Sequence, residues 1–349
     1  MKKVAVVLFN LGGPDSKKSI KPFLFNFFMD KNIIRLPQPF RFLIACLIAI
    51  RRSKKEAGAS YAFLGDKSPL LVNTQEQAEA LEQKLNETAG IEFKAFVCMR
   101  YWHPIAKDIV QQVKEWGADK IILLPLYPQF STTTTRSSFQ VWDKEADRQN
   151  LDAPSSAICC YPFNEGFIRA SAENIKTIFD VAKTDGVKNP RLLFSAHGLP
   201  EDIIRDGDPY QWQCEEAAAK IAKELGLHPS DWKICYQSRV GPKKWLSPST
   251  EDALREAAKD NKAVIIYPHA FTQEHVETLV EIEIEYRHMA HEFGVPGFYR
   301  VSTVGTHPAF IDGLVRLVHE SLDKKGTSAE LKTRICPPQF GRCCMEERS

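Results

Sequence analysis

The sequence predicts an α/β fold with two doubly wound, Rossmann-like parallel sheets, because short apolar runs alternate with helical patterns and the alternation occurs twice. The apolar runs have the length of strands buried on both faces and cover residues 4–11, 93–99, 120–126, 191–196, 233–236, 263–267 and 298–301. Helical patterns lie between many of them, at 74–87, 104–116, 165–182, 213–225 and 251–260. In such folds the ligand site is expected beyond the carboxyl ends of the strands.

The first run of the pattern ends and the second begins near a proline and a glycine, Pro162 and Gly166. We therefore predict an N-terminal α/β domain over residues 1–162 and a second one over 163–306. A helix at 308–322 follows, and the remaining polar tail has no periodicity.

Composition excludes several classes of function. The 349 residues are 44% hydrophobic and 26% charged, which is typical of a globular protein with a substantial core. The net charge of +2 gives no support to nucleic-acid binding. The apolar N-terminus is interrupted at Asn10 and by Gly12, Gly13 and Pro14, so it indicates a buried strand rather than a signal peptide, and we expect a cytoplasmic protein.

Residues 23–55 depart from the α/β pattern, since large apolar side chains dominate and a basic cluster, Arg51-Arg52-Ser53-Lys54-Lys55, ends the segment. The uninterrupted apolar run at 42–50 is far shorter than the ~20 residues that span a bilayer. Two interpretations stay open. The segment is either a core helix with a solvated basic end, or an apolar lip that contacts an apolar ligand or an anionic membrane surface.

Two elements carry candidate chemistry. His197 directly follows a predicted buried strand, where an imidazole can accept a proton or ligate a metal ion, although a lone histidine often only caps a loop. After the strand at 263–267, a predicted helix ending at Gly294 carries Glu277, Glu281 and Glu285 at a spacing of four, which places three carboxylates on one face. This row either faces water or binds cations and protons. Together, the histidine and the carboxylates suit proton removal and handling of a divalent metal such as iron.

The chain resembles the bacterial ferrochelatases of the protoporphyrin type along almost its whole length. The resemblance rests on several motifs in order, among them Leu11-Gly12-Gly13-Pro14, Arg100-Tyr101-Trp102-His103-Pro104, Tyr127-Pro128-Gln129-Phe130-Ser131, Ser195-Ala196-His197, Gln237-Ser238-Arg239-Val240-Gly241-Pro242 and His275-Val276-Glu277-Thr278-Leu279. It implies insertion of Fe²⁺, as a substrate, into protoporphyrin to give haem, in a porphyrin cleft between the two domains. It also implies that residues 307–349, a helix and a cysteine-containing tail, pack back on the first domain.

The resemblance also implies roles for individual residues. His197 and Glu277 are expected to be catalytic and to meet the iron, and Glu281 and Glu285 to continue an acidic path. The residues expected to contact or enclose the porphyrin are Leu11, Phe28, Arg51, Arg52, Tyr61, Ser68, Arg100, Tyr101, Tyr127 and Trp245, with the arginines meeting its propionates. The segment at 23–55 is similar to the family's apolar lip. Because of this similarity, one expectation is a peripheral contact of the segment with the inner face of the cytoplasmic membrane. Whether the protein forms a homodimer is left open.

Some ferrochelatases carry a [2Fe-2S] cluster held by one internal cysteine and three near the C-terminus. The sequence offers Cys336, Cys343 and Cys344 in the tail, with either Cys159 or Cys160 as the fourth thiolate. The adjacency of Cys343 and Cys344 departs from the expected pattern, and a tail with free thiols is the alternative.

Three other functions compete with this one: a coproporphyrin-type ferrochelatase, a non-catalytic haem or porphyrin carrier that uses His197 as an axial ligand, and a carbohydrate or nucleotide enzyme of the same fold class. The last has no glycine-rich phosphate loop to support it.

Overall fold

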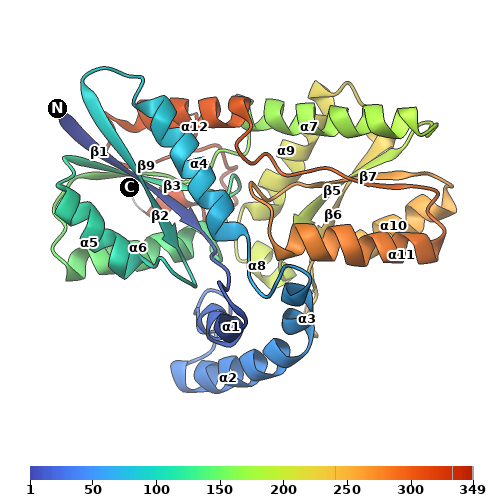
Figure 1. Cartoon of the computed structure of the whole chain (residues 1–349), viewed down its shortest axis with the longest axis horizontal. Coiled ribbons are helices and arrows are strands. Elements are labelled where there is room, and N and C mark those ends of the chain that lie inside the picture. Colours follow the sequence, from blue (N-terminus) through green and yellow to red (C-terminus); the bar gives the residue numbers. More distant parts are fainter. Residues whose placement is uncertain (240, 332, 348–349) are drawn as a thin grey trace. The chain divides into compact units, whose positions relative to one another are not determined.

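A computed structural model describes residues 1–239, 241–331 and 333–347, and it contains two parallel sheets (Figure 1). The first sheet has the strand order β2-β1-β3-β4-β9 and the second has the order β6-β5-β7-β8. The first comprises β1 (Lys2–Asn10), β2 (Ile91–Met99), β3 (Lys120–Pro125), β4 (Ser155–Ile158) and β9 (Gly326–Ser328). The second comprises β5 (Arg191–His197), β6 (Trp232–Gln237), β7 (Val264–Pro268) and β8 (Phe298–Arg300). The predicted fold class is confirmed.

The first sheet is covered by helices on both faces, so its central strand is buried on both sides. Val4 to Leu8 in β1 have no exposed surface. Helix α4 (Leu70–Leu85) lies on one face, and α5 (Ala106–Trp116) and α6 (Thr135–Arg148) lie on the other (Figure 1). Parallel strands buried on both faces are near-continuously apolar, which is why these runs could be recognised in the sequence.

The second sheet directs alternate side chains to two different layers of helices. Leu193 in β5 and Ile266 in β7 pack with α10 (Thr250–Lys259), α11 (Arg287–Phe293) and the π-helix η3 (Glu277–Tyr286). Tyr267, the next residue in β7, bonds through its hydroxyl to Ser171 Oγ of α7 (Glu165–Thr184) at 2.7 Å. Helix α9 (Tyr210–Glu224) contacts α7.

Residues 20–62 form three helices, α1 (Ile20–Phe28), α2 (Gln38–Lys54) and α3 (Glu56–Ala62). Phe23 and Leu24 of α1 are buried, whereas Leu43 and Leu47 of α2 are 59% and 60% exposed. Phe25 and Phe42 join the first two helices by an edge-to-face ring contact at 5.5 Å. Among the described residues, no helix is both long enough and apolar enough to cross a membrane.

The short elements were not predicted. They are η1 (Lys17–Ser19), α8 (Glu201–Arg205), η2 (Pro229–Asp231) and α13 (Cys344–Glu347); α12 (Pro308–Ser321) matches the predicted helix at 308–322. Strands β4 and β9 and helix α6 were missed as well. Strand β4 begins with two serines, β9 consists of Gly326, Thr327 and Ser328, and α6 is rich in polar residues, so none shows a clear apolar pattern.

The chain divides into two compact units. Unit 1 comprises residues 1–160, 315–334 and those from Cys344 on, and unit 2 comprises 161–314 and 335–343. The first division lies close to the boundary predicted at residue 162. The tail, which was predicted to pack on the first domain as a whole, is divided, since 335–343 belongs to unit 2. The predicted porphyrin cleft between the domains stays a prediction.

Candidate functional site

His197 is the last residue of β5 and lies at the carboxyl end of the second sheet. Its Nδ1 lies 2.6 Å from the carbonyl oxygen of Gly198, which can only accept, so Nδ1 carries a proton, and Nε2 is the nitrogen left free to gain or lose one. Tyr210 Oη donates to the His197 carbonyl at 3.0 Å. A Cβ at Gly198 would lie 2.7 Å from the carbonyl oxygen of Gln237, so only glycine allows the strand ends to approach this closely.

Glu277 lies between two histidines. Its Oε1 is 3.7 Å from His197 Nε2, and its Oε2 is 3.5 Å from His275 Nε2. The structure thus places His197 next to Glu277, while their catalytic roles stay a prediction. His275 is buried and was not predicted as a site residue, although it precedes Glu277 in the same motif. Its Nδ1 donates to the Gln273 carbonyl at 3.2 Å, so its Nε2 is the nitrogen that faces the carboxylate.

Both imidazoles therefore direct Nε2 at a carboxylate oxygen of Glu277. The two separations are too long for direct hydrogen bonds. A neutral imidazole offers a lone pair at this position, and a protonated one forms an ion pair with the carboxylate. The arrangement can therefore exchange protons. Imidazole nitrogen and carboxylate oxygen are donors that suit Fe²⁺, but the described side chains do not form a ready-made metal site.

Glu281 is held by four hydrogen-bond donors. Ser238 donates from its backbone N–H at 2.8 Å and from Oγ at 2.5 Å, Tyr286 Oη donates at 2.9 Å, and Gln237 Nε2 donates at 3.1 Å. Burial, and then the nearby negative charge of Glu277, nevertheless raise the pKa of the Glu281 carboxyl above its usual value. Glu281 therefore takes up a proton more readily than an isolated carboxylate does.

Glu285 differs from the other two carboxylates because it is exposed. The helix was predicted to end at Gly294, and it does so, with Gly294 in the left-handed conformation. The expected regular α-helical face is wrong, however, because residues Glu277–Tyr286 form a π-helix. Segments of π-helix are rare and are frequent at functional sites. The role of Glu285 in an acidic path stays a prediction.

In unit 1, Arg100 and Tyr101 converge on Asp30, a residue that was not predicted. Arg100 Nη2 and Tyr101 Oη donate to Asp30 Oδ2 at 2.9 Å and 2.7 Å, and Ser137 Oγ donates to the same oxygen. Asp30 and Tyr101 are almost completely buried. Burial, followed by the charge of Asp30, raises the pKa of the Tyr101 hydroxyl well above its usual value. The hydroxyl of Tyr101 and part of the Arg100 guanidinium therefore hold this network together.

The other residues predicted to contact the porphyrin lie in different environments. Phe28 and Tyr61 are buried, Arg51 is exposed, and Leu11, Arg52, Tyr127 and Trp245 are partly buried. Ser68 Oγ accepts from Leu70 N at 3.2 Å, at the start of α4. The buried polar atoms without a hydrogen-bond partner include Tyr127 Oη and Trp245 Nε1. Porphyrin contact by all ten residues stays a prediction.

The five cysteines considered for a cluster, Cys159, Cys160, Cys336, Cys343 and Cys344, are all buried. In unit 1, the sulfur atoms of Cys159 and Cys160 lie 3.4 Å apart. In unit 2, Gln213 Nε2 donates to Cys336 Sγ at 3.1 Å. Within the part of the chain that the structure describes, no three or more Cys, His, Asp or Glu side chains are grouped so that they could hold a metal ion.

Comparisons with known proteins decide the family. The ferrochelatase family model matches residues 3–322. This chain belongs to the ferrochelatase family. A ferrochelatase of Caulobacter vibrioides is 47% identical over 350 residues, with 99% of each chain covered. A ferrochelatase of Rickettsia bellii is 46% identical over 347 residues, with 98% of this chain and 95% of the relative covered.

Two solved structures share the fold. SirB from Bacillus subtilis with Fe³⁺ has a TM-score of 0.54 at 14% identity, covering 93% of this chain and 96% of that one. The sirohydrochlorin chelatase SirB from Bacillus subtilis subspecies spizizenii, in complex with cobalt, has a TM-score of 0.53 at 13% identity, covering 93% and 97%. As a ferrochelatase, the protein is a lyase that inserts iron into a porphyrin in haem biosynthesis, so the carrier and the carbohydrate or nucleotide enzyme are set aside.

Proposed function

We propose that Glu277, with His197 and His275 on either side, is the place where ferrous iron meets the porphyrin and where the pyrrole protons leave. The single observation that supports this is the carboxylate between two imidazole Nε2 atoms, at 3.7 Å and 3.5 Å.

The reaction makes two demands that this group of side chains meets. A porphyrin carries two N–H protons and presents its lone pairs in the ring plane, so the protons must leave as the metal arrives. His197 Nε2 can accept a proton as a general base, and the adjacent carboxylate of Glu277 stabilises the imidazolium that forms. The imidazolium can then pass its proton to Glu277, which restores neutral His197, and Glu281, with its raised pKa, can take that proton from Glu277 in turn. Binding energy from an apolar surround would offset the strain of a distorted macrocycle.

An alanine variant tests the role of His197. His197→Ala removes the proton acceptor, and we expect iron insertion to fall by about 100-fold or more, with partial recovery when imidazole is added. His288→Ala, which removes an exposed histidine of α11, is the control and should keep the parental rate. A parental rate in His197→Ala would contradict the assignment.

The porphyrin substrate is a separate question. An assay with coproporphyrin III beside protoporphyrin IX decides between the two porphyrins, and we propose protoporphyrin because the exposed face of α2 is apolar.

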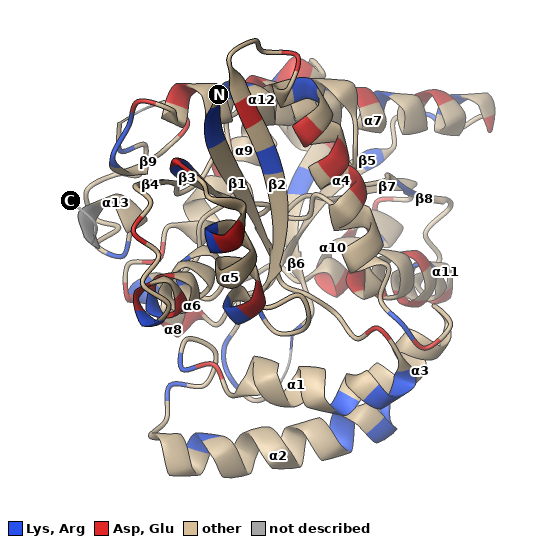
Figure 2. Ribbon diagram, turned by 60° about the vertical axis from the view of Figure 1, so that its left-hand side comes forward, with Lys and Arg blue, Asp and Glu red and all other residues tan. Residues whose placement is uncertain are grey.

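We also propose that α2 rests on the inner surface of the cytoplasmic membrane. Phe40, Leu43 and Leu47 are each more than half exposed on this helix. Arg51, Arg52 and Lys54 lie in its last turn, and Figure 2 shows blue segments of the ribbon, which mark lysine and arginine, at this end of α2. An apolar helix face beside a basic cluster is the usual form of a peripheral contact with anionic lipid. A homodimer stays a prediction that sedimentation would test.

A [2Fe-2S] cluster held by Cys336, Cys343, Cys344 and one of Cys159 or Cys160 is our third proposal. The donor chemistry supports it, since all five candidate thiols are buried, three of them in a tail that is otherwise polar, and Gln213 directs an N–H at Cys336 Sγ. Hydrogen bonds to sulfur are one means by which a protein tunes such clusters. When bound, the cluster would supply cross-linking of the tail rather than a step of iron insertion.

Visible absorption and electron paramagnetic resonance of anaerobically purified protein test the cluster. We expect a coloured protein that loses its absorption bands in Cys336→Ser and keeps them in Cys46→Ser, because Cys46 lies on α2 and is not one of the proposed ligands. A colourless, fully active parent, produced with ample iron and sulfide, would contradict the proposal. Separate Cys159→Ser and Cys160→Ser variants would identify the internal ligand.

A further inference from the structure

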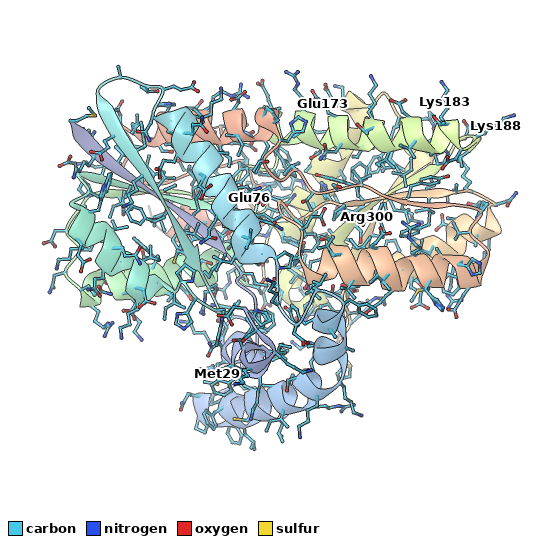
Figure 3. All side chains as sticks on the ribbon, in the orientation of Figure 1. Met29, Glu76, Glu173, Lys183, Lys188 and Arg300 are labelled. Atoms are coloured by element: carbon cyan, nitrogen blue, oxygen red, sulfur yellow. The ribbon has the colours of Figure 1, made fainter. Side chains whose placement is uncertain are left out.

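Arg300, the last residue of β8, is bound to two carboxylates of the segment that carries the site. Its Nη1 lies 2.9 Å and 3.1 Å from the two oxygens of Glu274, and its Nε lies 3.1 Å from Glu283 Oε2. Its side chain is only 14% exposed. Glu274 precedes η3 and Glu283 lies within it, so one guanidinium joins β8 to two points of this helical segment (Figure 3).

Glu274 in turn fixes the backbone that carries His275. Besides Arg300, it accepts from the Thr303 N–H at 2.9 Å and from Thr278 Oγ1. The same Thr278 hydroxyl accepts from the His275 N–H at 3.0 Å. A displacement of Glu274 would therefore move the backbone N–H of His275, and with it the imidazole that faces Glu277.

The π-helix itself needs anchoring from outside. A π-helix usually lasts for a single turn, whereas η3 extends over ten residues. One face of it is anchored by burial, since Ile282 and Tyr286 pack in the core beneath the second sheet. The opposite, polar side is anchored at Glu283, which binds both Arg300 and Arg287. Of these two arginines, only Arg300 also contacts Glu274.

We propose that Arg300 is a positioning residue for iron insertion, which holds the start and the middle of η3 so that Glu277 stays between His197 and His275. The inference rests on the proposed function of those three residues. Arg300 does not touch the reacting atoms. Its Nη1 contacts both oxygens of Glu274 while its Nε binds Glu283, and lysine has only one nitrogen for these two carboxylates.

Arg300→Gln and Arg300→Lys test this role, with Arg287→Gln as the matched control. Arg287 also binds Glu283 but is much more exposed. We expect Arg300→Gln to lower kcat/KM for Fe²⁺ by about tenfold or more, because small displacements of reacting groups reduce rates strongly. Arg300→Lys should fall between it and the parent, and Arg287→Gln should match the parent. The KM for protoporphyrin should stay unchanged in all three.

Hydrogen exchange provides the readout that separates positioning from general stability. Amides of residues 274–286 should exchange faster in both Arg300 variants, while those of β5 and β7 keep their parental rates. Exchange that rises equally in β5, β7 and η3, or a kcat/KM for Fe²⁺ within about twofold of the parent, would overturn the proposal. If Arg300→Gln does not fold, the same two criteria apply to Arg300→Lys. Glu277→Gln, assayed in parallel, tests the proposed function independently of Arg300. A parental rate of iron insertion in Glu277→Gln would contradict the proposed function, whatever the Arg300 variants show.

Discussion

At the scale of single residues, His269 is a buried histidine that directly follows β7 and takes no part in the proposed chemistry. Its Nε2 donates to the Cys214 carbonyl at 2.8 Å, and its Nδ1 is buried without a hydrogen-bond partner. Burial lowers the pKa of this imidazole to about 4. The folded protein therefore keeps His269 neutral under conditions in which the unfolded chain, with a pKa near 6.5, binds a proton.

This difference predicts how stability depends on pH. A histidine whose pKa is lowered by folding contributes to the free energy of unfolding. This contribution is complete above the unfolded pKa and is lost as the pH falls from 6.5 towards 4. Lowering the pH from 7.5 to 5 should reduce the free energy of unfolding by about 2 kcal/mol through the protonation of His269 in the unfolded chain. Urea unfolding of the parent and of His269→Gln at both pH values measures this. An equal loss in both proteins would show that His269 does not titrate as described.

The sequence predicted some site residues and missed others for a physical reason. His197 could be recognised because it ends an apolar strand, and Glu277 because its helix follows the next strand of the sheet. Asp30 and Arg300 could not, because their partners, Arg100 and Glu274, belong to other segments of the chain. Nothing in the local pattern indicates which distant carboxylate an arginine will meet.

At the scale of elements, the exposed face of α2 gives a prediction about lipid binding. Leu43→Ser together with Leu47→Ser removes two large exposed apolar side chains, each worth about 1.5–3 kcal/mol when buried. We expect co-sedimentation with phosphatidylglycerol vesicles to fall by at least about tenfold, and phosphatidylcholine vesicles to bind the parent weakly.

Leu331→Ser is the matched control for the lipid experiment. Leu331 is 64% exposed and lies outside α1, α2 and α3, so its loss should leave vesicle binding unchanged. Equal binding by the parent and the double α2 variant would mean that α2 does not contact the membrane.

The elements themselves were predictable to different degrees. Buried strands such as β1 and β3 are continuous apolar runs, and their bounds were found within a few residues. The π-helix was not foreseen, because the spacing of four between its glutamates is equally compatible with an α-helix. What selects the π form are contacts such as those of Ser238 with Glu281 and of Arg300 with Glu283, which belong to tertiary structure.

At the scale of the whole molecule, the repeated strand–helix pattern was sufficient to predict two parallel sheets, but not the order of their strands. In the first sheet, β1 lies between β2 and β3, and β9 pairs with β4 although more than 150 residues separate them in the chain. Strand β9 consists of Gly326, Thr327 and Ser328, so its sequence alone indicates a loop. It is a strand because β4 presents a neighbouring edge with unpaired backbone groups.

The central claim is that iron insertion depends on the carboxylate of Glu277 between two histidines, and one comparison tests it most directly. Glu277→Gln and Glu292→Gln each replace a carboxylate by an amide of the same shape, but only Glu277 faces His197 and His275, whereas Glu292 is an exposed residue of α11. A stopped assay of Fe²⁺ insertion into protoporphyrin should show a loss of about 100-fold or more in Glu277→Gln and a nearly parental rate in Glu292→Gln. Equal rates in the two variants would contradict the account.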